Sequence, residues 1–202
     1  MRNFGPFQIA AIDAGTFWLD GGAMFGTVPR PLWEKENPPD AHNRIALATR
    51  CLLLIDPRST PARRILIETG CGGRLEPKAV AQMSIAAEGG IVESLAHFQI
   101  SPNDITDVIL THLHFDHAGG MSRFASGGSR EVELCYPAAR VYVQADNVET
   151  ARRPNPRERA SYLKEDVLAV ERSRLELTRG TQEICPGVWV HQGNGHTRGL
   201  QW

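Results

Sequence analysis

The chain has 202 residues, of which 42% are hydrophobic, and its formal net charge at pH 7 is −1. A chain of this length and composition can bury one substantial core, so we expect a single domain over residues 1–202. Because the net charge is close to zero, no broad electrostatic attraction draws the chain to nucleic acid or acidic lipid, and we expect neither as a partner.

The apolar runs are too short for a membrane-spanning helix. The aliphatic run at 52–55 is far below the roughly 20 residues that a membrane-spanning helix needs. The first residues lack the basic stretch and apolar run of a secretory signal, so we expect a cytoplasmic protein. Cysteines occur at 51, 71, 135 and 185 without C-x-x-C spacing, which argues against a zinc ribbon and against a dense disulfide framework.

Three segments in the first third of the chain are predicted to be neighbouring strands of one sheet. They are rich in isoleucine, leucine and aromatic residues, and glycine, proline or aspartate bounds each of them. Their ranges are 7–22, 44–56 and 63–70. The proline-rich residues 29–43 lie between the first two segments and predict an ordered but irregular loop.

Helices and further strands are predicted in the remainder of the chain. The second half of 78–98 has helical spacing, with Ile91, Leu95 and Phe98 on one face, and Pro102 is expected to stop this helix. Further segments are a short buried strand in 105–112, strands at 139–144 and 187–192, and an amphipathic helix, continuous or broken once, at 157–175. This order favours a layered α/β sandwich over an all-helical or all-β domain.

Residues 112–117, "HLHFDH", place three histidines and an aspartate within six positions. On an extended backbone His112 and His114 point to the same face and can bind one ion. Asp116 and His117 are adjacent and cannot both share that face, so a turn before them would offer this pair to a second ion. Imidazole nitrogen and carboxylate oxygen are ligands that Zn²⁺ favours, with Fe and Mn as competitors.

A single histidine is more often structural than a metal ligand, and we expect this of His42 and His97. The cluster is different, because burying so many polar groups without a metal would leave them unpaired, at a cost of about 1–3 kcal/mol each. The two glycines that follow, Gly119 and Gly120, are expected to let the backbone bend sharply and start a helix beside the ions.

The "HLHFDH" segment resembles the H-x-H-x-D-H loop of the metallo-β-lactamase superfamily. Two more segments carry the resemblance. "ILIETG" (65–70) is similar to the first motif of the family, with Glu68 where aspartate is usual. "NGHTRGLQ" (194–201) is similar to the third motif, with Arg198 where proline is more common. By this resemblance His196 completes the ligand set of the first ion, whereas His191 is expected to be structural.

The resemblance implies an αβ/βα four-layer sandwich and a dinuclear zinc site. His112, His114 and His196 would fix the first ion, and Asp116 and His117 would bind the second. Two metals share a water and lower its pKa, so that a metal-bound hydroxide attacks a carbonyl carbon or a phosphorus. Asp116 would also relay a proton to the leaving group, and is therefore the expected catalytic residue.

The segment 17–33 and the gap of about 80 residues between the two histidine motifs resemble a branch with quorum-quenching lactonases and methyl-parathion-type hydrolases. In that branch the apolar residues Phe17, Trp18, Met24, Phe25 and Trp33 would lie near the mouth of the active site. The alternative is that they form a hydrophobic plug in the core.

The sequence ends six residues after His196. The carboxylate that bridges both ions in the family, and the last histidine of the second ion, therefore have no assignable residue. We expect the second half of the fold to be truncated and the chain to be an incomplete version of a longer enzyme. The alternative is a short form that fills the gap as a homodimer.

The favoured function is a dinuclear zinc hydrolase that acts on a small-molecule lactone or ester. Alternatives are a phosphotriester hydrolase, an iron-dependent oxidoreductase of the same fold, and a truncated metal-binding chain without turnover. Metal analysis with a visible absorption spectrum would distinguish iron from zinc. The serine-hydrolase motif Gly-x-Ser-x-Gly is absent from the sequence, which argues against a serine nucleophile.

Overall fold

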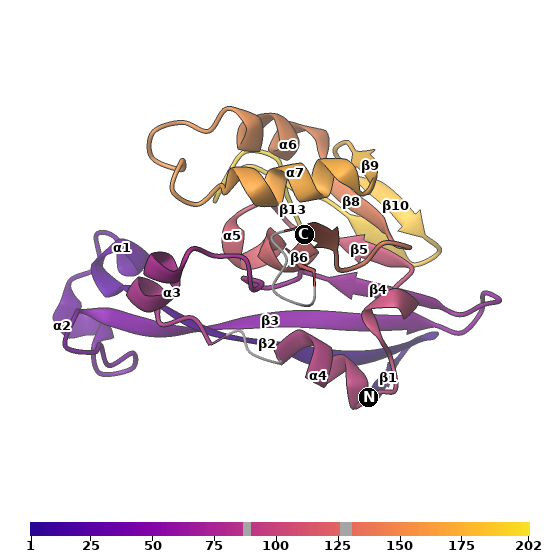
Figure 1. The fold of residues 1–202 in the computed structure, drawn as a ribbon, viewed down its shortest axis with the longest axis horizontal. Coiled ribbons are helices and arrows are strands. Elements are labelled where there is room, and N and C mark those ends of the chain that lie inside the picture. The colour runs from indigo at the N-terminus through magenta and orange to yellow at the C-terminus, as the bar shows by residue number, and fades with distance from the viewer. Residues whose placement is uncertain (87–89, 126–130) are drawn as a thin grey trace.

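The computed structural model describes residues 1–86, 90–125 and 131–202 and contains one large mixed sheet (Figure 1). Its strands follow the order β1-β2-β3-β4-β5-β8-β9. The pairs from β1 to β4 are antiparallel, and those from β4 to β9 are parallel. The bounds are β1 Arg2–Phe4, β2 Phe7–Asp20, β3 Arg44–Asp56, β4 Arg63–Ile67, β5 Asp107–Ile109, β8 Arg140–Gln144 and β9 Arg174–Thr178. The predicted mixed α/β fold is confirmed.

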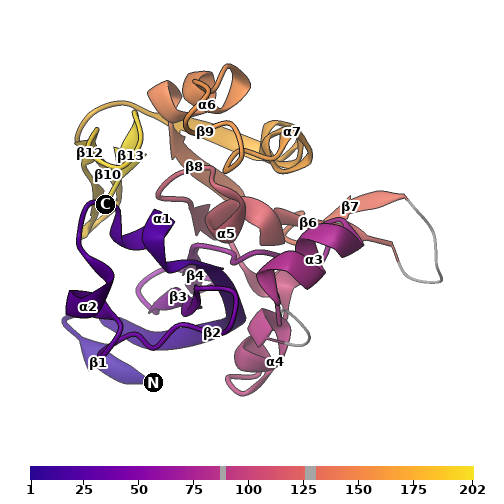
Figure 2. The ribbon, with the colours of Figure 1, turned by 90° about the vertical axis from the view of Figure 1, so that its left-hand side faces the viewer.

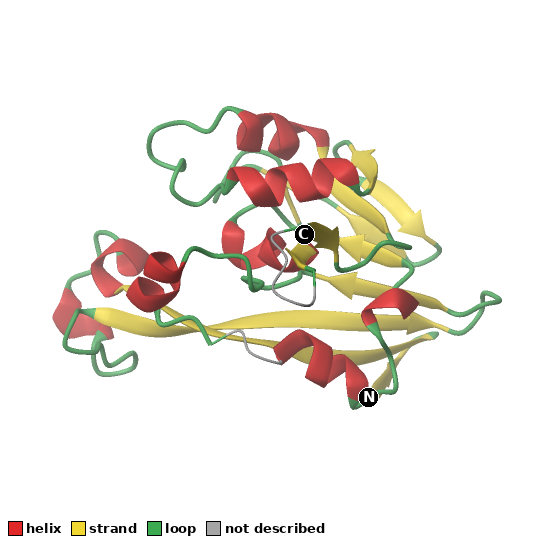
Figure 3. Cartoon of the chain, viewed as in Figure 1, coloured by secondary structure: helices red, strands yellow, loops and turns green. Residues whose placement is uncertain are grey.

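Short helices and three small hairpins complete the described chain (Figure 3). The helices are α1 Gly21–Phe25, α2 Arg30–Trp33, α3 Pro77–Met83, α4 Gly90–Ala96, α5 Phe115–Ala118, α6 Ala145–Arg152 and α7 Lys164–Arg172, with 3₁₀ turns η1 Pro102–Asp104 and η2 Gly119–Met121. The hairpins pair β6 Ser122–Phe124 with β7 Val132–Leu134, β10 Gln182–Cys185 with β11 Val188–Val190, and β12 Gln192–Gly193 with β13 Leu200–Gln201.

The two faces of the sheet bury different residues because successive side chains of a strand point to opposite sides. Leu66, Val108 and Val141 belong to the larger core cluster, which also takes residues from α4, α6 and α7. Ile65 and Ile109 belong to a second cluster, which the β10–β11 hairpin covers. Seen along the strands in Figure 2, α4 and α7 lie on one side of the sheet and β10 on the other.

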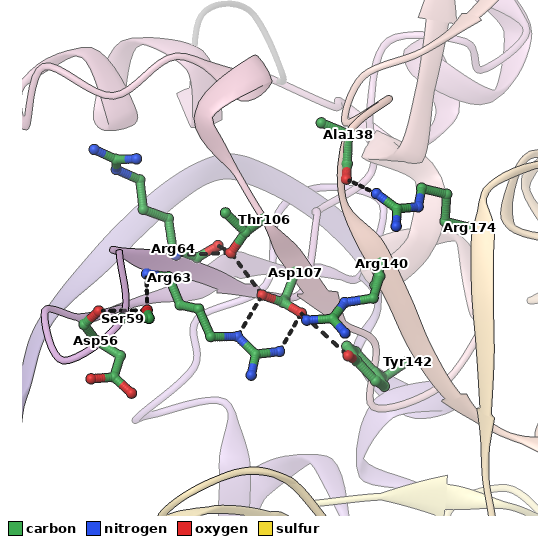
Figure 4. A network of polar contacts seen from close by, with 10 residues as sticks. All are labelled: Asp56, Ser59, Arg63, Arg64, Thr106, Asp107, Ala138, Arg140, Tyr142 and Arg174. Carbon is green, nitrogen blue, oxygen red and sulfur yellow. Dashed lines mark hydrogen bonds and ion pairs between the residues drawn. The ribbon is translucent and has the colours of Figure 1, made fainter. Parts of the chain in front are cut away.

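A polar network joins the parallel strands near their amino ends (Figure 4). Asp107, fully buried at the start of β5, accepts two hydrogen bonds from the guanidinium of Arg63, at 3.0 and 2.7 Å. It also accepts from Thr106 Oγ1 at 2.7 Å and from Tyr142 OH at 3.3 Å, and Arg140 Nη2 lies 3.3 Å away. A buried carboxylate is tolerated because every lone pair finds a donor, and the network fixes β4, β5 and β8 relative to one another.

Most predicted strands are present, but the helix predicted over 157–175 is wrong at both ends. The side chain of Asn155 accepts hydrogen bonds from the backbone N–H groups of Arg157 and Glu158, which makes a turn there. The helix α7 begins only at Lys164, and after it β9 pairs in parallel with β8. Tertiary pairing thus overrides the helical pattern.

The remaining predictions have mixed outcomes. The predicted loop 29–43 includes the single-turn helix α2, and positions 87–89 of the range 78–98 lie outside the described residues. All four cysteines are free thiols, as the sequence indicates. Among the helices that the structure describes, none combines the length and the apolar character needed to cross a bilayer.

Candidate metal centre

The clustered histidines follow the carboxyl ends of the parallel strands, where ligands bind in open α/β sheets. Strand β4 leads into Glu68, and β5 leads through Thr111 into the histidine segment that ends in α5. Strand β8 leads into α6 beside them. Residues that are far apart in the sequence therefore meet at one edge of the sheet.

Three imidazoles meet at this edge, as the sequence predicts. One possible ligand atom each of His112, His114 and His196 lies within 4.8 Å of the others. The Nδ1 atom of His114 is 3.2 Å from the Nε2 atom of His196. Two nitrogens bound to one tetrahedral zinc ion at 2.0–2.1 Å are about 3.3–3.4 Å apart, so the observed separation suits a shared ion.

The protonation of the buried imidazoles also suits a cation. Burial, followed by the charge of His117, lowers the pKa of His112 to about 2. Burial and the neighbouring His196 lower the pKa of His114 to about 4. Both rings are therefore neutral at pH 7, as metal binding requires. The Nε2 atom of His112 is buried and has no hydrogen-bond partner among the described residues, a cost that a bound metal would remove.

The second predicted pair, Asp116 and His117, contacts a carboxylate from another loop. The Nδ1 atom of His117 bonds to Glu68 Oε2, and its Nε2 atom lies 3.4 Å from Asp116 Oδ2. Burial alone lowers the pKa of His117, but its hydrogen bonds with Asp116 and Glu68 raise it to about 10. The other oxygen of Glu68 accepts from the backbone N–H of Thr111 at 2.6 Å. The sequence singled out Glu68 only as an unusual residue of the first motif.

The glycines after the histidine segment have a role that the sequence prediction missed. Gly119 has φ of −60°, an ordinary helical value. Its importance is packing: a Cβ at Gly119 would lie 2.1 Å from the backbone oxygen of Cys71, and one at Gly120 would lie 2.1 Å from that of Thr69. The two loops of the site therefore touch backbone to backbone, which only glycine permits.

A cavity of about 310 Å³ opens beside the imidazoles. His114, Asp116, His117 and His196 line it together with Glu68. Its apolar wall contains Phe17, Leu19, Met24, Leu47 and Phe115. The cavity therefore has polar side chains that could bind a metal on one side and apolar side chains on the other.

The apolar segment 17–33 divides between the two roles that the sequence left open. Phe17 and Met24 line the cavity of the candidate site, whereas Trp18 lines a neighbouring one. Trp33 is buried and stacks on Phe25 with ring centroids 4.7 Å apart. Met24 is exposed at the cavity, whereas Phe17 is buried behind its surface. Phe25 and Trp33 pack against each other.

The remaining histidines lie elsewhere, in agreement with the sequence analysis. His42 and His97 are exposed, and neither belongs to the group of clustered ligands found in the described chain. His191 stacks on Trp202 and its Nδ1 atom lies 3.1 Å from Thr181 Oγ1. These contacts assign His191 a packing role.

Comparisons with known proteins agree with the fold. A family model described as the metallo-beta-lactamase superfamily matches residues 47–188. An N-acyl homoserine lactonase of Bacillus cereus is 29% identical over 153 residues, which cover 74% of this chain and 51% of that protein. The chain thus spans about half the length of this curated relative.

Two solved structures resemble the chain over nearly its whole length. A probable metal-dependent hydrolase from Staphylococcus aureus superposes with a TM-score of 0.85 at 29% identity, covering 99% of this chain and 69% of that one. A quorum-quenching N-acyl homoserine lactone lactonase gives a TM-score of 0.65 at 26% identity, covering 96% and 65%.

Proposed function

The chain belongs to the metallo-β-lactamase superfamily, and on that premise we propose that it is a metal-dependent hydrolase of lactones or related esters. The observation that carries the proposal is the meeting of His112, His114 and His196 beside a cavity with an apolar side, which His114 and His196 line. Relatives named N-acyl homoserine lactonases support the choice of a cyclic ester as substrate.

In this proposal the three imidazoles hold the first ion, and zinc is the expected metal. When bound, such an ion supplies Lewis-acid polarisation of the substrate and lowers the pKa of a coordinated water. The chain supplies the rest: imidazole donors, of which those of His112 and His114 are buried, and the apolar side chains of Phe17, Met24 and Leu47 to hold the organic part of a substrate beside them.

Asp116 and His117 are proposed as ligands of a second zinc ion. Both line the same cavity, and the rings of His112 and His117 have centroids 4.1 Å apart. His117 bonds to Glu68 through Nδ1, so its Nε2 atom, 3.4 Å from Asp116 Oδ2, is the nitrogen that would bind the ion, and Glu68 would orient the ring. Asp116 lines the cavity, and we propose that its carboxylate carries a proton to the leaving group.

A metal titration combined with a substrate screen tests the proposal. Protein freed of metal is loaded with Zn²⁺, Mn²⁺ or Fe²⁺ and offered N-acyl lactones, aryl esters and phosphotriesters. We expect the lactones to be hydrolysed only after loading. His114→Ala should abolish metal binding and turnover, whereas His97→Ala, an exposed histidine outside the cluster, should change neither. Wild-type turnover in His114→Ala would refute the proposed role.

The Asp116→Asn variant tests whether Asp116 binds the second ion and not the first. If Asp116 belongs to the second site, the variant loses rate and keeps one metal per chain, as measured by elemental analysis. Loss of both metals would show that Asp116 also supports the first site.

A further inference from the structure

We propose that Asn147 is a positioning residue for the metal centre, because its side chain joins the loop of His112 and His114 to the loop of His196. The inference rests on the proposed function, since it concerns the same three imidazoles. Asn147 lies in the first turn of α6, immediately after β8, and is fully buried. It is itself no part of the cluster of metal-competent ligands.

The side-chain amide of Asn147 makes three hydrogen bonds, one through its oxygen and two through its nitrogen. Its Oδ1 atom accepts from the backbone N–H of Leu113, between the two histidines, at 2.9 Å. Its Nδ2 atom donates to the backbone oxygen of Arg198, two residues after His196, at 2.9 Å, and to Tyr162 OH at 3.2 Å. The reversed amide would face a donor with a donor and an acceptor with an acceptor, so the contacts fix its orientation.

No other residue type of similar size satisfies these partners. The position needs one acceptor and two donors in a planar group. Aspartate would keep the bond from Leu113 but would bring a carboxylate against the carbonyl of Arg198. Leucine or alanine would leave the buried N–H of Leu113 without this partner, at about 1–3 kcal/mol, and would also remove the part-buried bond to the carbonyl of Arg198.

The backbone of the His196 loop also rests on α6. Gly199 has φ of +75°, and a Cβ there would lie 2.2 Å from the backbone nitrogen of Asn147. The loop therefore approaches the helix as closely as backbone atoms allow. The amide of Asn147 then sets where along the helix the loop is held.

A second set of contacts steadies the same two loops from the side of Tyr162. The hydroxyl of Tyr162 lies 2.7 Å from Thr197 Oγ1, and Thr197 donates to Glu158 Oε2 at 2.7 Å. The ring of Tyr162 packs edge-on against His114, with centroids 4.5 Å apart. Tyr162 thus contacts one loop through its ring and the other through its hydroxyl, and Asn147 bonds to that hydroxyl.

The distance between the two loops along the sequence explains why the placement of the histidines depends on Asn147. His114 and His196 are 82 positions apart in the sequence, yet their nearest ring nitrogens are 3.2 Å apart. Nothing in either loop alone sets that separation. Partners that orient metal ligands typically change metal affinity or activity by 10–100-fold when they are removed, because a misplaced ligand must be ordered at the moment of binding.

Cobalt binding measures the effect without relying on turnover. Co²⁺ replaces zinc in such sites and gives visible absorption bands that report nitrogen ligation. We expect Asn147→Asp and Asn147→Ala to bind Co²⁺ about 10–100-fold more weakly than the wild type, with weaker visible bands. Asp107→Asn is the matched control: it removes the charge of an equally buried side chain at the other end of the parallel strands, and should lower the thermal midpoint without weakening Co²⁺ binding.

A double-mutant cycle with His196→Ala identifies the route of the effect. If Asn147 acts by placing His196, Asn147→Asp should cost little further Co²⁺ affinity once His196 is removed. Binding of Co²⁺ by folded Asn147 variants within twofold of the wild type would overturn the inference and leave the proposed function intact. Equal weakening in Asp107→Asn would overturn it as well, because the effect would then follow stability alone. A wild type without nitrogen-ligated Co²⁺ bands would overturn both proposals.

Discussion

Replacing Gly119 by alanine should destabilise the protein at the point where the two loops of the site touch. The added methyl group would lie 2.1 Å from the backbone oxygen of Cys71, whereas ordinary contacts of a Cβ begin at 3.4 Å. The obstacle is backbone and not the end of a flexible side chain. The loops must therefore separate by roughly 1 Å to restore normal van der Waals contact.

The size of the destabilisation can be worked out from the hydrogen bonds between the two loops. Thr69 N donates to His117 O at 2.9 Å, and Gly120 N donates to Gly70 O at 3.1 Å. Overpacking costs about 1–3 kcal/mol, and each weakened bond adds about 0.5–1.5 kcal/mol. We therefore expect a loss of about 2–6 kcal/mol in the free energy of unfolding, together with weaker metal binding, because His117 and its neighbours move with the loop.

Gly73 in the facing loop supplies the control. A Cβ there would meet nothing within 4 Å, and its φ lies outside the left-handed region. Gly73→Ala should therefore be neutral or stabilising by about 0.4–1 kcal/mol, because it restricts the unfolded chain. Urea denaturation of both variants and the wild type measures the difference. A Gly119→Ala protein as stable as Gly73→Ala would refute the reasoning.

The other predictions concern the network at the amino ends of the strands, the core and the metal. Asp107→Ala should cost about 3–5 kcal/mol of the free energy of unfolding, because it leaves Arg63 without its buried partner. Burial raises the pKa of Asp107, but the hydrogen bonds from Arg63 and the other donors lower it overall. The carboxylate therefore stabilises the fold above its unfolded pKa near 3.9, and this contribution is lost as the pH falls through the folded pKa. Urea denaturation from pH 7 to about pH 2 should show the difference between the wild type and the variant shrinking once the pH falls below about 3.9, and a constant difference over that range would contradict the assignment. Leu95→Ala, which opens a cavity in the larger core cluster, should cost about 2–5 kcal/mol while Co²⁺ affinity stays unchanged. Zinc at 100 times its dissociation constant should stabilise the wild type by about 2.7 kcal/mol, a gain that a chelator removes and that His114→Ala should lack in thermal unfolding.

The sequence was most informative where chemistry and spacing coincide. Three histidines and an aspartate in six residues indicated a metal site without any structure, and His196 was assigned to it through a motif about 80 residues away. The long strands β2 and β3 were also predictable, since their pattern of apolar residues is strong over more than ten positions.

Other features left no local signal. Residues 174–178 were assigned partly to a helix because their strand character appears only when β8 lies beside them. Asn147 belongs to no sequence motif, and it stands out only through its hydrogen bonds to residues 113, 162 and 198. Gly119 was expected to bend the chain, but its ordinary φ and its contact with Cys71 show that it is needed for close approach.

By itself, the sequence determined the side-chain types of the proposed ligands, their local spacing and the alternation of strands and helices, because each of these depends on neighbouring residues. Only the tertiary structure decided how the imidazoles of two distant loops come to face one another, and which buried amide and glycines hold them there. The reason is physical: a separation of 3.2 Å between His114 and His196 is set by the packing of loops onto α6 and onto each other, and packing is a property of the folded chain.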